Sequence, residues 1–298
     1  MLAASLCQLS NEADQLKNSS SQSLELTMLN DSKLGDLEKM SLKSDMISLE
    51  MPIFALAKCP DFKSFEWISV DAKRSLIVIP STLYGRATIF DYDVLIYAIS
   101  VAAKRLHEGY AQGLEVQFTA HEYLRATGRG AGGKDYQALD SSLSRLSTTT
   151  IQTNIANGGR IVKSFFHLLD VANFVVGKNG RVQVVKIKLS DWIYSAINTR
   201  QMLSIDPSYF SLGRPLERKI YQISRKHIGD KGVWKIGIEK LLKKTGSRTS
   251  AKEFKRELNK VIARDEIPNY RLRIEGDIVV VYVKDQTKLA SSITGSAL

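Results

Sequence analysis

The order of hydrophobic patterns along this chain repeats once, and this repeat restricts the possible folds more than any other feature of the sequence. In the first half, residues 91–108 carry apolar side chains at helical spacing, and residues 114–118 alternate like a short strand. Thr119-Ala-His-Glu122 then has the form of a capping box, which begins a second helix. A glycine-rich turn leads into a third helix from Lys134, and residues 165–189 contain two strand-like stretches joined by a Lys-Asn-Gly turn.

The second half shows the same order with different residues. Residues 216–227 have the spacing of a helix, residues 233–236 that of a short strand, and residues 238–245 that of a second helix. Ser250-Ala-Lys-Glu253 is another capping box, which opens a third helix, and residues 270–283 form a predicted hairpin. A winged helix has this order of elements: helix, strand, helix, turn, helix and hairpin. The sequence therefore predicts an α+β fold with two tandem winged-helix domains.

Composition divides the chain around these two units. Residues 1–50 contain no Phe, Tyr or Trp and are rich in Ser, Leu, Asp and Glu, so we expect a disordered or weakly helical N-terminal extension. The leucines of residues 24–49 leave open a short partner-binding helix. We expect the N-terminal winged-helix domain over 51–205, the C-terminal one over 206–285, and a flexible tail over 286–298.

The positive charge of the chain is concentrated in one stretch. The formal net charge is +11, from 42 Lys and Arg against 31 Asp and Glu. Residues 214–264 hold sixteen basic and five acidic residues, so this stretch alone matches the whole excess. Solvated surfaces usually mix both signs, and a one-sign concentration on helical segments is typical of a nucleic-acid surface. An acidic membrane surface is the alternative partner for such charge.

Two helices are candidates for entering the major groove of double-stranded DNA, because each has a buried stripe and an opposite polar stripe. Lys, Arg, Gln and Asn are the side chains that contact phosphates and base edges. The ordinary alternative is a solvated helix face. The outer stripe of the first helix holds Lys134, Gln137, Ser141, Ser144 and Arg145, and that of the second holds Lys252, Arg256, Asn259 and Lys260, with Arg248 just before it.

Other cations flank these two helices, and we expect them to contact the DNA backbone. Cations at the hairpin tips are placed to approach an adjacent groove or the backbone, although solvated hairpins have the same appearance. The expected phosphate contacts are Arg129 in the first half and Lys240, Lys243 and Lys244 in the second; the hairpin cations are Lys178, Arg181, Arg271 and Arg273.

Residues 128–135, Gly-Arg-Gly-Ala-Gly-Gly-Lys-Asp, match most of the phosphate-binding loop of nucleotide-binding proteins. That loop needs a preceding strand and a Ser or Thr after its Lys, whereas here a helix precedes and Asp135 follows. The four histidines lie far apart, with no His-x-His pair for a metal-dependent nicking enzyme. We therefore expect a protein without enzymatic activity, cofactor or metal.

The sequence also indicates the compartment. The longest strongly apolar run, residues 94–103, is far shorter than the ~20 residues that span a bilayer, and no compact apolar segment follows a basic start. Cys7 and Cys59 have no second cysteine or histidine at zinc-ligand spacing. We expect a cytoplasmic protein, associated in bacteria with the nucleoid or a plasmid.

An ordered series of short stretches resembles the replication initiator protein A family of plasmids. The stretches include Gly-Arg-Ala-Thr-Ile-Phe-Asp-Tyr-Asp at 85–93, Val-Gln-Phe-Thr-Ala-His-Glu-Tyr-Leu at 116–124, Leu-Ser-Asp-Trp-Ile-Tyr at 189–194 and Pro-Leu-Glu-Arg-Lys-Ile-Tyr at 215–221. The resemblance covers roughly residues 51–285. It implies an initiator that binds repeated sites in double-stranded origin DNA, helps to open the duplex, and recruits the host replication initiator and replicative helicase. Many related initiators also repress their own promoter as homodimers.

Three other functions fit some of the same features. A transcriptional regulator would use the same modules without a role in replication. A nicking initiator would need a nucleophilic tyrosine and a metal site. A scaffold or membrane-surface protein would need only the charge.

Overall fold

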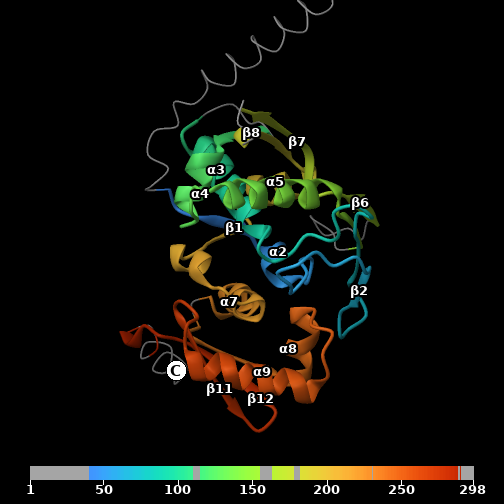
Figure 1. The fold of residues 1–298 in the computed structure, drawn as a ribbon. Coiled ribbons are helices and arrows are strands. Elements are labelled where there is room, and N and C mark those ends of the chain that lie inside the picture. The colour runs from blue at the N-terminus through green and yellow to red at the C-terminus, as the bar shows by residue number, and fades with distance from the viewer. Residues whose placement is uncertain are drawn as a thin grey trace, which may run out of the picture.

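The computed structural model describes residues 40–109, 115–154, 163–177, 182–229, 231–287 and 289. The described residues form two modules, one above the other in Figure 1. The N-terminal module contains β1 (Lys43–Asp45), α2 (Met46–Glu50), β2 (Phe65–Ile68), β3 (Ser75–Ile79), α3 (Tyr92–His107), β4 (Glu115–Thr119), α4 (Ala120–Ala126), α5 (Gly133–Thr148), β5 (Thr150–Thr153), β6 (Ser164–Phe166), β7 (Leu169–Val176), β8 (Val182–Leu189), α6 (Asp191–Asn198) and β9 (Met202–Ser204). The C-terminal module contains the 3-10 helix η2 (Pro207–Ser211), α7 (Pro215–Ile228), β10 (Val233–Gly237), α8 (Ile238–Thr245), α9 (Ala251–Arg264), β11 (Tyr270–Glu275) and β12 (Ile278–Val283).

The two modules repeat one arrangement of elements. In the first module the shared elements follow in the order α3, β4, α4, α5, β7 and β8. The antiparallel sheet there has the strand order β4-β8-β7. In the second, α7, β10, α8, α9, β11 and β12 follow in the same order, and the sheet has the order β10-β12-β11. The repeat of mixed helix and sheet expected from the sequence is therefore present in the structure.

The two expected capping boxes form to different extents. Thr119 Oγ1 accepts a hydrogen bond from the Glu122 amide at 3.1 Å, and the Glu122 carboxylate accepts one from the Thr119 amide at 2.7 Å. Ser250 Oγ accepts from the Glu253 amide at 3.2 Å, but the Glu253 carboxylate pairs with Arg256 instead of turning back. Only the first is thus a complete capping box.

A four-stranded sheet in the N-terminal module has no counterpart among the described residues of the second and was not expected. Its strand order is β2-β3-β5-β6, so that strands from before α3 pair with strands from after α5. Phe65, Trp67, Leu76 and Val78 are buried on one face of this sheet. The sheet thus ties residues 65–79 to the core of the module.

The predicted extension ends at residue 50, but residues 43–50 belong to the folded module. β1 pairs with β9, with Lys43 opposite Ser204, and α2 packs against α7. Leu42 and Leu49 are buried although this segment has no aromatic residue. Residues 1–39 and most of the predicted tail at 286–298 lie outside the described residues.

Polar side chains join the two modules along α7. Lys219 is buried, and its ammonium group donates hydrogen bonds to the carbonyls of Leu49 at 3.1 Å and Met51 at 2.7 Å. Burial lowers the pKa of Lys219 to about 7, with the positive charge of Lys244 acting in the same direction. Interfaces of this polar kind hold modules in a defined relative orientation because each buried donor needs its partner.

Candidate nucleic-acid interface

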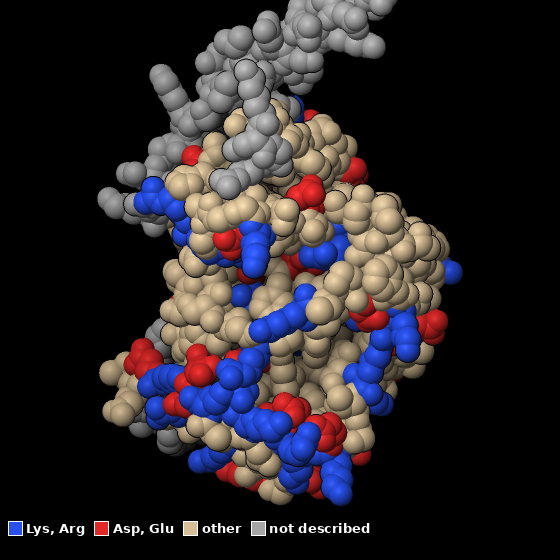
Figure 2. All heavy atoms as spheres, viewed as in Figure 1, with Lys and Arg blue, Asp and Glu red and all other residues tan. Residues whose placement is uncertain are grey.

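Helix α9 presents a continuous polar face to solvent. Phe254, Leu258 and Val261 are buried against the module, which leaves the opposite stripe exposed. That stripe contains Lys252, Arg256, Asn259 and Lys260, all exposed. Figure 2 shows Lys and Arg gathered over the C-terminal module along this helix, with Asp and Glu between them. The four residues that the sequence predicts for this face therefore lie together on one surface.

Two of the four side chains on this face of α9, Arg256 and Lys260, form ion pairs that are exposed to solvent and weak. Arg256 contacts Glu253 at 2.5 Å and Lys260 contacts Glu257 at 2.7 Å, and the Arg256 and Lys260 side chains are 65% and 49% exposed. The hydrogen bond from Lys260 lowers the pKa of Glu257, so this carboxylate stays ionised. Exposed pairs of this kind are weak in water, so either cation can exchange its partner for a phosphate or a base edge.

The other two residues of this face, Lys252 and Asn259, have no ion pair or side-chain hydrogen bond among the described residues. An amide can bind the donor and acceptor of an adenine edge, and an ammonium group can bind a phosphate or guanine. The exposed face of α9 can therefore offer both kinds of contact that a DNA site requires.

The lysines of α8 divide between solvent and an internal ion pair. Lys240 and Lys243 are exposed. Lys244 instead contacts the buried carboxylate of Glu50 at 2.5 Å, which Lys226 also contacts at 2.7 Å. Burial alone would raise the pKa of Glu50, but the hydrogen bonds from Lys226 and Lys244 outweigh it and lower the pKa to about 2. Lys244 joins the two modules and is not a free phosphate ligand, contrary to its expected role.

Arg248 precedes α9 and also contacts the N-terminal module. Its guanidinium lies 3.2 Å from the Asp61 carboxylate and donates to the Ser64 carbonyl at 2.9 Å. The side chain remains 43% exposed. Arg248 thus links residues 61–64 to the start of α9 while part of it faces solvent.

Helix α5 contributes fewer free groups than the sequence predicts. Lys134 and Gln137 are exposed, and Ser141 and Ser144 are half-buried. Arg145, expected on the outer face, donates both of its hydrogen bonds at 2.7 Å to the buried carboxylate of Asp91. Its guanidinium is held inside the module because Asp91, 1% exposed, would otherwise be an unpaired buried charge.

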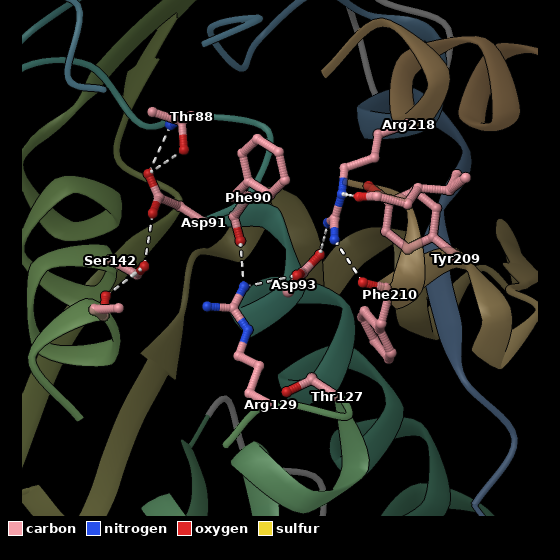
Figure 3. Close-up of polar contacts among 12 residues, drawn as sticks. Thr88, Phe90, Asp91, Asp93, Thr127, Arg129, Ser142, Tyr209, Phe210 and Arg218 are labelled. Carbon is pink, nitrogen blue, oxygen red and sulfur yellow. Dashed lines mark hydrogen bonds and ion pairs between the residues drawn. The ribbon is translucent and has the colours of Figure 1, made fainter. Parts of the chain in front are cut away.

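Arg129 also points inward, as Figure 3 shows. Its guanidinium donates to Asp93 at 2.8 Å and to the Phe90 carbonyl at 3.3 Å. Asp93 lies between Arg129 and Arg218, and Arg218 contacts its other oxygen at 2.5 Å. Burial raises the pKa of Asp93, and the two arginines act in the opposite direction. Arg129 therefore stabilises the junction of α3 and α4, in contrast to its expected phosphate contact.

The hairpin cations are only partly described. Lys178 and Arg181 lie outside the described residues. Arg271 and Arg273 are exposed, and they pair with Asp265 at 2.8 Å and with Glu275 at 2.7 Å. These pairs have the same exposed character as those on α9, so both arginines stay accessible to an anionic partner.

The glycine-rich turn before α5 is closed by its own aspartate. The Asp135 carboxylate accepts a hydrogen bond from the Gly132 amide at 3.2 Å, and a Cβ at Gly130 would lie 2.9 Å from the same carboxylate. A side chain at Gly130 would therefore displace the Asp135 carboxylate from its present position. The negative charge at this helix start opposes phosphate binding, in agreement with the sequence argument against a nucleotide loop.

Within the described ranges, no three His, Cys, Asp or Glu residues form a group suited to a metal ion. A bilayer-spanning helix is likewise absent from that part of the chain.

Sequence reasoning missed the carboxylates that bind the inward-facing cations. These are Glu50, Asp61, Asp91 and Asp93, each far along the chain from the cation it contacts. Asp91 does stand before an apolar helical run, which is a position typical of a helix cap. In the structure, however, its side chain makes no cap hydrogen bond and turns to Ser142 and Arg145 instead.

Comparisons with known proteins agree with one another. A family model described as Replication initiator protein A matches residues 43–272. A protein of Wigglesworthia glossinidia brevipalpis with the name "Putative replication protein" is 33% identical over 244 residues, which are 80% of this chain and 86% of that protein.

Two crystal structures of domains 2 and 3 of RctB have a similar fold. One superposes with a TM-score of 0.58 at 11% identity, covering 80% of this chain and 98% of that chain. The other gives a TM-score of 0.54 at 12% identity, covering 82% and 99%. At these identities the likeness concerns the fold alone.

Proposed function

The chain belongs to the replication initiator protein A family, and from this premise we propose that it initiates plasmid replication by binding specific double-stranded sites at an origin. The observation that carries the proposal is the exposed face of α9, where Lys252, Arg256 and Asn259 lie on one stripe. Such a stripe fits the major groove, with the buried stripe held by the module.

Both modules act as winged helices in this proposal. The repeated order of elements and the matching strand orders β4-β8-β7 and β10-β12-β11 support that assignment. Figure 1 shows α5 and α9 on the same side of the molecule, as two helices that meet one duplex would be. Helix α9 reads bases, whereas α5 has fewer free groups and contributes through Lys134 and Gln137.

Phosphate contacts supply most of the affinity. Lys240 and Lys243 are exposed beside α9 and are suited to this role. The arginines at the hairpin, Arg271 and Arg273, follow the backbone next to the groove. The protein has no catalytic step in this scheme.

The proposal has three further parts. They are origin opening, contacts with the host initiator and the replicative helicase, and a homodimer that represses the initiator's own promoter. Their support is family membership. The protein acts in the bacterial cytoplasm on its own plasmid.

The decisive experiment compares origin DNA with random DNA of the same length, by fluorescence anisotropy. Arg256→Ala and Asn259→Ala should each weaken origin binding by about 1–3 kcal/mol and random-DNA binding much less. Lys73→Ala, which removes an exposed lysine from the turn before β3, is the matched control and should change neither. Equal losses on both DNAs would show that α9 only positions the protein.

An experiment in cells distinguishes a role in replication from a role in transcriptional regulation. A plasmid that carries the origin should be lost when Arg256→Ala replaces the wild-type chain. A plasmid that is copied normally without functional protein would assign the chain to regulation instead.

A further inference from the structure

A groove lies between β1 and the second half of α3, beside the first described residue of the chain. Its volume is about 630 Å³, within the range of about 300–1,000 Å³ that is typical of ligand sites. β1 packs against α3, and the Lys43 amide donates a hydrogen bond to Ser100 Oγ at 2.7 Å, so the two walls of the groove are held together. The lining includes Met40, Lys43, Ser100, Ala103, Lys104 and His107.

The lining of this groove combines apolar surface with positive charge. Met40 and Ala103 are half-buried. Lysines beside apolar groups cover them with methylene groups and keep the ammonium group near water. Lys43 donates to the neutral hydroxyl of Ser204 at 2.8 Å, and Lys104 shares a weak, exposed pair with Glu108 at 3.8 Å. The groove therefore suits a segment that carries apolar side chains and negative charge.

The residues just before the groove have this composition. Residues 24–38 contain five leucines, at positions 24, 26, 29, 34 and 37. They contain four acidic residues, at 25, 31, 36 and 38, and one basic residue, Lys33, so their formal net charge is −3. The next two leucines along the chain, Leu42 and Leu49, are buried in the N-terminal module. Part of this leucine-rich stretch thus already packs against the module.

The segment is long enough to return along the groove. Met40 lines the groove and is the first described residue, so the chain enters the module at this point. Ser100 and His107 are seven residues apart on α3, which is about 11 Å along the helix. Six residues of extended chain span about 20 Å, so Leu34 can reach either end of the groove from Met40.

We propose that the groove between β1 and α3 is occupied by residues 24–38 of the same chain. Leu34 and Leu37 insert between the two elements, and the acidic side chains at 36 and 38 face Lys43 and Lys104. This docking covers apolar surface on both sides and closes the groove to other proteins. The inference goes beyond the proposed function, because it does not depend on DNA.

The test is disulfide trapping in the full-length chain, with the native Cys7 and Cys59 changed to Ser. Lys33→Cys, which keeps all five leucines, is combined with His107→Cys, at an exposed position in the groove. Only cysteines with Cα atoms within about 7 Å pair readily, so an intrachain bond should form roughly tenfold faster than in the control pair. Rates are measured by peptide mass spectrometry after quenching.

The control pair is Lys33→Cys with Arg105→Cys. Arg105 is on the same helix, two residues from His107, but its side chain lies outside the groove. Adding Leu37→Asp to the His107 pair should lower its rate to that of the control, because a carboxylate replaces the apolar contact. Thermal melting confirms that each variant is folded.

Three outcomes would overturn the inference. Equal rates at positions 105 and 107 would mean that the segment has no preferred site on α3. Failure of both pairs to form would leave the groove to another partner. In the third, a chain with only Lys33→Cys is mixed with a chain with only His107→Cys. An interchain bond as fast as the intrachain one would assign the groove to the segment of a second copy.

Discussion

Helices α5 and α9 hold equivalent positions in two modules of the same strand order, yet the arginines predicted for their DNA surfaces are bound in opposite ways. Around α5, Arg145 and Arg129 are bound by the buried carboxylates of Asp91 and Asp93, and their side chains are 14% and 22% exposed. On α9, Arg256 is 65% exposed and is held only by acids of its own helix. The number of cations on a helix therefore does not measure the charge it can offer to DNA.

The difference follows from the cost of burying charge. A carboxylate inside the protein needs a cation, and once paired, neither partner can leave without several kcal/mol of loss. An exposed pair gains little from Coulomb attraction in water and breaks readily. Buried pairs thus hold Arg129 and Arg145 in place, and exposed pairs leave Arg256 available.

The largest expected effect is on stability. Asp93→Ala leaves Arg218, which is buried, without its carboxylate, and should lower the free energy of unfolding by about 3–5 kcal/mol in urea titrations. Glu253→Ala breaks the exposed pair with Arg256 and should change it by about 0.5 kcal/mol or less. Similar losses for both variants would remove the distinction between the modules.

The next effect depends on pH. The pKa of Glu50 is lowered to about 2 from an ordinary 4.5, so its pairs stabilise the folded chain fully above pH 4.5 and are lost as the pH falls through 2. Glu50→Gln should therefore cost about 2–3 kcal/mol at pH 7, and the difference from wild type should shrink below pH 4.5.

The measurement is urea unfolding of both proteins at several pH values. His227, whose pKa is lowered to about 4 by burial and by Lys226 and Lys244, titrates in the same window, and Glu50 acts on this pKa in the opposite direction. The difference between the two curves therefore reports Glu50 together with its effect on His227. A difference that stays constant down to pH 2 would mean that the pKa of Glu50 is the same in the folded and the unfolded chain.

A smaller effect compares the two helices on DNA. The double variant Lys252→Ala, Asn259→Ala should weaken origin binding by about 2 kcal/mol or more, and Lys134→Ala, Gln137→Ala by less, because Arg145 is bound to Asp91 and cannot assist α5. Fluorescence-anisotropy titrations at one salt concentration measure the loss of origin affinity in each double variant. Equal losses would show that both helices read bases to the same degree.

The smallest effect separates two adjacent lysines of α8. Lys243 is exposed, so Lys243→Ala should reduce the slope of log affinity against log salt by roughly one ion. Lys244 is paired with Glu50, so Lys244→Ala should leave this slope unchanged. A reduced slope in Lys244→Ala would mean that the pair opens on DNA.

Local patterns predicted the elements well. Helix α8 spans the predicted residues 238–245, α7 extends one residue beyond each predicted limit, and α5 and α9 begin within one residue of their predicted starts. Apolar spacing, capping residues and glycine turns are local signals, so they locate helices and hairpins directly. The order of elements in both modules followed from these signals.

Strand pairings and ion pairs between residues far apart in the sequence could not be predicted from local patterns. The pairing of β3 with β5 and the burial of Leu49 beside α7 join segments that no periodicity connects. Likewise, Arg145 has the sequence context of an exposed residue, and only the position of Asp91, 54 residues earlier, shows that it is bound. The outer face of α9 was predictable because every one of its partners is on the same helix.

The pairing of β1 with β9 has a consequence for synthesis. Lys43 lies opposite Ser204 and its ammonium group donates to the Ser204 hydroxyl, a contact between residues 161 positions apart. A growing polypeptide therefore cannot complete its first module until residue 204 has left the ribosome. The residues of α2 have by then been synthesised for most of the time of translation. They reach their final place only when α7, the next α-helix to leave the ribosome, packs against them.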